Sequence, residues 1–166
     1  MPEKETIERA KRAKRRGERP STQAGEFVRE EIHHIREGKH GARSTKQAIA
    51  IGLSKGRRAG VKLTPPAPGK AKAKTRKSAE SAYRKGQSGA RATSPRRARA
   101  TRAALKREGR SAASHQSLSR QARSAASRRT GAERRAAAQR AVRTKGPARR
   151  RAAAKKAART RARRAS

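Results

Sequence analysis

The sequence contains no cysteine and no tryptophan, and it has only one Phe, one Tyr and one Met. It also contains neither Asp nor Asn. The absence of cysteine excludes disulfides and thiolate metal sites. It also means that cysteine usage does not indicate whether the protein works in an oxidising or a reducing compartment. Without Asp or Cys, Asp-based two-metal sites, cysteine nucleophiles and Asp-oriented triads are excluded as well. We therefore expect a protein that is not an enzyme and that uses no cofactor.

Negative charge is also scarce, since 50 Lys and Arg stand against 11 acidic residues, for a net charge of +39. Most of the 31% of hydrophobic residues are Ala, which release little free energy on burial. Residues 64–166 carry 33 of the Lys and Arg and three Glu. High charge with low hydrophobicity is typical of disorder. The composition predicts an all-α protein with a small helical hairpin head and a long basic tail, largely disordered or nascent-helical.

The head is predicted at residues 21–63, which hold nearly all the large apolar residues. Its first helix has Ala24, Val28, Ile32 and Ile35 at steps of four, four and three, so they share one face. An acidic outer face is predicted opposite them, formed by Glu26, Glu30 and Glu37.

The second helix of the hairpin has clear boundary signals. Ser44 and Gln47 form a capping box at its start, and Gly60 is a left-handed C-cap at its end. Gly52 and Gly56 continue one face of this helix, and we interpret them as a surface of close approach for the partner helix.

Outside the head we predict a charged N-terminal helix or arm at 1–20, a Pro/Ala/Lys linker at 64–76, and a low-complexity basic tail at 77–166. Ser94-Pro95 predicts a helix start in the tail, and Gly146-Pro147 predicts a break between two helices. No apolar run approaches a membrane span, and the N-terminus lacks the apolar core of a secretory signal. We expect a cytoplasmic, nucleoid location and no membrane partner.

The basic tail predicts binding to a polyanion, because each cation that neutralises a phosphate releases condensed counterions. Aromatic side chains that stack on unpaired bases are missing apart from Tyr83, which favours a duplex over a single strand or an RNA loop. The prediction is non-sequence-specific binding and condensation of double-stranded DNA. The candidate contact residues are the Arg and Lys clusters: Arg57, Arg58, Arg96, Arg97, Arg128, Arg129, Arg134, Arg135, Arg149, Arg150, Arg151, Lys155, Lys156, Arg161, Arg163 and Arg164.

Two alternatives fit the same composition. An RNA-binding or ribosome-associated basic protein would need the same charge. A protein-interaction module would instead dock a partner through the apolar residues of the head, with the tail only localising it. Self-association through the hairpin is a related alternative, because so small a seam is marginally stable alone. The residues concerned are Val28, Ile32, Ile35, Ile49 and Leu53.

Three histidines near the hairpin turn are candidate metal ligands. His33 and Glu37 stand four residues apart on the first helix, and His34 and His40 lie close by in sequence. Adjacent histidines on a helix point in different directions, and no fourth ligand is evident. We interpret them as surface or turn histidines and assign no metal site.

Residues 21–63 resemble a small bacterial family of uncharacterised short basic proteins, some of them labelled plasmid-stabilisation or DNA-binding proteins. The most specific part is Ser44 to Val61, with KQAIAIGLS at 46–54, a basic stretch and Gly60. Where the family usually has Ala, this chain has Gly56. The tail resembles histone-like Ala/Arg/Lys-rich extensions. The resemblance implies DNA binding, and it implies no catalytic residues.

Overall fold

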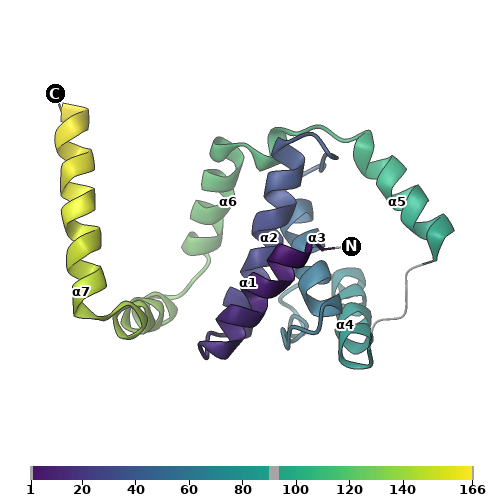
Figure 1. The fold of residues 1–166 in the computed structure, drawn as a ribbon, viewed down its shortest axis with the longest axis horizontal. Helices are drawn as coiled ribbons and strands as arrows, with labels where there is room; N and C mark the ends of the chain where they lie inside the picture. The colour runs from purple at the N-terminus through teal and green to yellow at the C-terminus, as the bar shows by residue number, and fades with distance from the viewer. Residues whose placement is uncertain (1, 90–93, 166) are drawn as a thin grey trace. The chain divides into compact units, whose positions relative to one another are not determined.

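The structure is a computed structural model, and it describes residues 2–89 and 94–165. All regular elements in these residues are helices (Figure 1). The all-α prediction is therefore confirmed. The elements are α1 (Lys4–Arg15), α2 (Pro20–Arg36), α3 (Thr45–Arg58), α4 (Ala73–Gln87), α5 (Pro95–Lys106), the 3₁₀ helix η1 (Ser111–Ala113), α6 (His115–Ser127) and α7 (Gly131–Ala165).

The predicted hairpin consists of α2 and α3, and the end signals of α3 act as expected. The Ser44 hydroxyl accepts a hydrogen bond from the Gln47 amide at 3.2 Å. At the other end Gly60 has φ +87°, and the Val61 amide donates to the Gly56 carbonyl at 3.1 Å. This left-handed turn satisfies a carbonyl that the helix leaves unpaired, and it directs Val61 into the core.

Two small apolar clusters lie along α2, which packs against both α1 and α3 (Figure 1). The first cluster joins α1, α2, α3 and the non-helical segment that follows α3. It consists of Ala10, Ala24, Phe27 and Val61, with Ile7, Leu53 and Leu63 at its edge. The second joins α2, α3, η1 and α6: Ile32, Ile35, Ala42, Ala48, Ala112 and Ala113, with Val28 and Leu118 at its edge. Of the large apolar residues predicted to form the hairpin contact, all but Ile49 belong to these clusters: Val28, Ile32, Ile35 and Leu53.

Gly52 brings the backbones of α2 and α3 into direct contact, as predicted. A Cβ atom at Gly52 would lie 2.6 Å from Val28 Cα and 2.9 Å from the Phe27 carbonyl oxygen. Since both neighbours are backbone atoms, they cannot turn aside as a side chain would. A glycine at this position therefore sets the distance between the two helices.

Gly52→Ala should destabilise the head, whereas Gly25→Ala should stabilise it. Overpacking costs about 1–3 kcal/mol and exceeds the gain in helix propensity of about 1 kcal/mol. At Gly25, also within a helix, nothing lies within 4 Å of the added Cβ, so only the propensity gain of about 1 kcal/mol remains. Urea denaturation of both variants measures these changes. Equal stabilities for the two variants would contradict the close contact at Gly52.

The prediction of a long disordered tail is wrong, because the chain is helical again from Ala73, within the predicted linker, and some of these later helices contribute to the head. α4 packs on α3 with Ala79 and Ala82 buried, and a Cβ at Gly86 would overlap the Arg57 carbonyl. Ala112 and Ala113 of η1 complete the second cluster. These contacts need small side chains, and the Ala content that reduced the expected core allows this close packing.

The described chain divides into two compact units, residues 1–121 and 122–166. The second unit holds the end of α6 and all of α7. α7 is broken at Gly146, which has φ +65° and ψ 170° and precedes Pro147, as the sequence predicted. Its only large apolar side chain is Val142, which is exposed. Within the described residues, no helix combines the length and the apolar character needed to cross a bilayer.

Candidate nucleic-acid interface

α5 presents an uninterrupted row of positive charge. Arg96, Arg99, Arg102 and Lys106 recur at steps of three, three and four, which places them along one side of the helix, and Arg97 adds a fifth cation. α5 contains no acidic residue, and none of its residues is buried. Among the described residues, no ion pair joins these five cations to a carboxylate. Their charge is therefore available to an external anion.

α7 carries a higher charge and has no apolar face. It contains 14 Lys and Arg against one acidic residue, Glu133. A helix with no apolar stripe has no side chains to bury against a protein core. Its surface therefore faces solvent or a polar partner. Ala and Arg are both strong helix formers, which explains why the segment is helical without such packing.

The predicted contact residues are, with two exceptions, exposed. Arg58 lies in the last turn of α3, Arg96 and Arg97 in the first turn of α5, and Arg128 and Arg129 directly after α6. The side chain of Arg164 is outside the described residues. The remaining exposed residues all lie on α7: Arg134, Arg135, Arg149, Arg150, Arg151, Lys155, Lys156, Arg161 and Arg163.

Arg57 is the other exception, because its side chain is buried rather than exposed. Its guanidinium donates to the carbonyls of Leu63 at 3.0 Å and of Thr64 at 3.3 Å. Burial lowers its pKa. These bonds hold the chain that leaves α3, so Arg57 supports the fold and cannot reach a phosphate in this conformation.

The acidic outer face predicted for α2 is wrong at Glu30, since that side chain is only 1% exposed. The next residue, Glu31, is fully buried, which helical spacing did not predict. Lys55 of α3 lies with its Nζ 2.6 Å from Glu31 Oε2 and 3.7 Å from Glu30 Oε1. The Glu3 amide, just before α1, also donates to Glu30 Oε1 at 3.3 Å. Residues distant in sequence thus cover the carboxylates.

The structure separates the histidines that the sequence grouped. His33 Nε2 lies 3.1 Å from Glu37 Oε1 on the exposed side of α2. In contrast, Glu31, His34 and His40 each place one ligand atom within 4.8 Å of the others. The sequence signal for this group is the spacing of Glu31 and His34, which are three residues apart on a helix. His40 joins them because the turn after α2 brings it back toward the helix.

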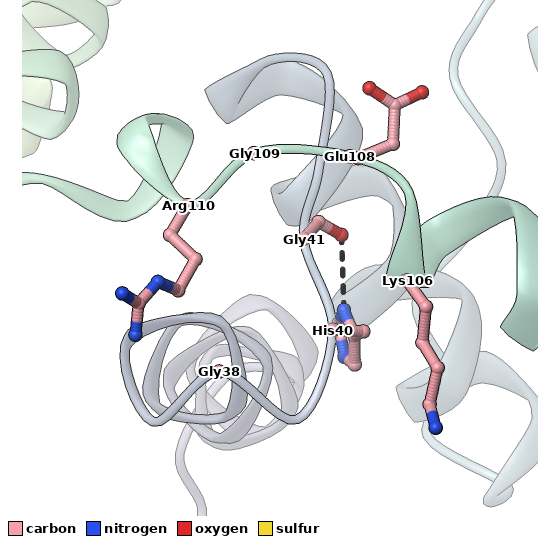
Figure 2. Close-up of a pocket in the computed structure, with 7 residues that line it drawn as sticks. All are labelled: Gly38, His40, Gly41, Lys106, Glu108, Gly109 and Arg110. Atoms are coloured by element: carbon pink, nitrogen blue, oxygen red, sulfur yellow. Dashed lines mark hydrogen bonds between the residues drawn. The ribbon is translucent and has the colours of Figure 1, made fainter.

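His34 and His40 are positioned by further hydrogen bonds. His34 Nε2 lies 2.8 Å from Glu3 Oε1, and this bond, together with the Lys39 ammonium, lowers the pKa of Glu3. His40 Nδ1 lies 3.0 Å from the Gly41 carbonyl oxygen. Figure 2 shows this bond on the wall of a pocket that is lined by Gly38, His40, Gly41, Lys106, Glu108, Gly109 and Arg110.

The chain matches no family model, no curated protein and no solved structure. That residues 21–63 are related to the bacterial family of short basic proteins therefore stays a prediction.

Proposed function

We propose that this protein binds duplex DNA without sequence preference and condenses it, as a nucleoid-associated, histone-like protein. The observation that carries the proposal is the set of exposed cations on α5, which buries none of its residues, and on α7, which has no apolar face. Such cations neutralise phosphates and release counterions, and this gain is independent of base sequence. The proposed role of the head, together with the helices that complete its two apolar clusters, is to carry the charged helices.

The chemistry of these helices favours a duplex. An α-helix fits the major groove, and Arg also enters narrow minor grooves. Readers of single strands stack bases on aromatic rings. Tyr83 is the only Tyr of the chain, and it is partly buried on α4. The Arg and Lys side chains therefore supply phosphate contacts, and no stacking platform accompanies them among the described residues.

Two cations at the N-terminal helix, Lys11 within α1 and Arg16 directly after it, provide a matched comparison for those of α5. Lys11 Nζ lies 2.8 Å from Glu8, and Arg16 Nε lies 2.8 Å from Glu18. These two cations already have carboxylate partners, whereas Arg96 and Arg97 have none among the described residues. Both pairs are exposed, so both can be changed without disturbing a core.

Replacing Arg96 and Arg97 with Gln should reduce the dependence of DNA affinity on salt. Each lost phosphate contact makes the slope of log affinity against log salt shallower by about 0.9, so we expect a change of about 1.8. The Lys11→Gln, Arg16→Gln variant should change the slope by much less. Fluorescence anisotropy with two unrelated duplexes, over a series of salt concentrations, measures both slopes.

A strong preference for one duplex sequence, or equal slopes for the two variants and the wild type, would contradict the proposal. Competition by a structured RNA at fixed salt tests the RNA alternative. If the RNA displaces the duplex at a much lower nucleotide concentration, RNA is the preferred partner and the DNA proposal is wrong.

A further inference from the structure

We propose that Glu31, His34 and His40 bind one divalent transition-metal ion of the zinc type. Two imidazoles and one carboxylate are a donor set that zinc uses, with water in a fourth position. One ligand atom from each residue lies within 4.8 Å of the others in the described structure. The site is separate from the basic helices, and the inference does not depend on DNA binding.

The hydrogen bond of His40 directs a lone pair at Glu31. When His40 Nδ1 donates to the Gly41 carbonyl, the neutral ring has no proton on Nε2. That nitrogen lies 3.3 Å from Glu31 Oε1. With the ring neutral, these two acceptors repel each other, and a metal ion between them removes the repulsion as a proton on Nε2 would. Two ligands on one tetrahedral zinc ion stand roughly 3.3 Å apart, so this pair already has the separation that the ion requires.

His34 is oriented in the manner of a metal-bound histidine. Its Nε2 lies 2.8 Å from Glu3 Oε1, so that nitrogen can donate its proton to the carboxylate. Nδ1 is then the nitrogen with a free lone pair. Ligand histidines commonly donate the proton of the second ring nitrogen to a carboxylate or a carbonyl, and these partners fix the ring. Glu3 and the Gly41 carbonyl hold these two positions.

The charge at the site also calls for a cation. In the part of the chain that the structure describes, Glu30 and Glu31 are buried beside a single ammonium group, that of Lys55. Neither oxygen of Glu31 accepts a hydrogen bond with good geometry, although Lys55 Nζ is close to Oε2. One positive charge cannot neutralise two buried carboxylates, and such charges are costly when unbalanced. A divalent ion at Oε1 would supply the missing charge, with Lys55 still held at Oε2.

The loop that carries His40 is fixed on both sides. Gly38 has φ +79°, and the Lys39 amide donates to the His34 carbonyl at 3.0 Å, which closes α2 and turns the chain back. Beyond His40, the Gly41 amide donates to the Leu105 carbonyl at 2.9 Å. His40 also lines the pocket of Figure 2, so it lies between the buried cluster and solvent and provides an entry path for an ion.

Calorimetric titration of the EDTA-treated full chain with ZnCl₂ tests the proposal. We expect one ion per chain, and at least a tenfold loss of affinity in His34→Gln and in His40→Gln. Glu3→Gln, which removes only the orienting carboxylate, should weaken binding about 10-fold to 100-fold. The control is His33→Gln, because His33 is exposed on the same helix and joins no such cluster among the described residues; this variant should bind zinc as the wild type does.

The absence of saturable one-to-one binding would overturn the proposal, and so would an equal loss of affinity in His33→Gln and His40→Gln. Circular dichroism in EDTA shows whether each variant is folded. If His34→Gln does not fold, the visible spectrum of the wild type with Co²⁺ still decides the question. A tetrahedral site gives an intense absorption band, while a spectrum like that of hydrated Co²⁺ would contradict the site.

Discussion

Removal of α7 should make the affinity for duplex DNA far less sensitive to salt. The helix supplies 14 of the 50 Lys and Arg residues, and the only acidic residue within it is Glu133. If about half of these cations contact phosphates, roughly seven contacts are lost and the salt slope becomes shallower by about six. The full chain should lose about 10³-fold to 10⁵-fold in affinity between about 50 and 200 mM salt, and a chain ending at Thr130 much less.

A second variant separates charge from helix structure. In it the Lys and Arg of α7 are replaced with Gln, whose helix propensity is similar, so the segment keeps its length and its preference for helix. Its salt slope should equal that of the chain ending at Thr130. If either variant retained the slope of the wild type, the phosphate contacts would have to lie elsewhere, and α7 would have no part in the proposed interface.

The ends of α3 and its contact with α2 could be predicted because the signals are local. Ser44 and Gln47 are three residues apart, and the left-handed turn at Gly60 follows from residues within one helical turn. Gly52 could be placed on the contact face from helical spacing alone. In each case the partner atoms are nearby in the chain, or the residue type has few other uses.

The buried carboxylates could not be predicted in this way. Helical spacing places Glu30 away from the apolar stripe of α2, which normally means exposure to solvent. Its burial depends on Glu3 before α1 and on Lys55 of α3, 27 and 25 residues away. The periodicity of the α2 sequence does not predict contacts with residues so far away in the chain. The same helix therefore combined an apolar face that the sequence predicted with a buried charged face that it did not.

The prediction of a disordered tail was wrong because Ala affects folding in two opposite ways. As a component of hydrophobicity it adds little, so the segment after residue 63 was predicted to lack a core. As a small side chain and a strong helix former it allows helices to form and pack closely. Ala82 and Ala113 are almost fully buried in this way. Neither position differs in its sequence surroundings from the many other Ala residues of the tail, so neither could be predicted to be buried.

Lys55→Met should strongly destabilise the head, because it removes the only ammonium group that the described residues place near two buried carboxylates. The Lys55 amine lies 2.6 Å from Glu31 and 3.7 Å from Glu30, whose side chains are 0% and 1% exposed. Methionine keeps most of the side-chain volume but leaves the charges uncompensated. Breaking a buried pair by removing one partner costs about 3–5 kcal/mol. Urea denaturation at neutral pH in the presence of EDTA measures the effect without bound metal.

Lys46→Met is the matched control, since Lys46 is exposed on the same helix and should tolerate the change within about 0.5 kcal/mol. Adding Glu31→Gln to Lys55→Met should recover a large part of the lost stability, because one of the two buried charges is then removed. A Lys55→Met variant as stable as Lys46→Met would show that the carboxylates are not charged in the folded protein. The electrostatic reason for placing a cation at Glu31 would then no longer hold.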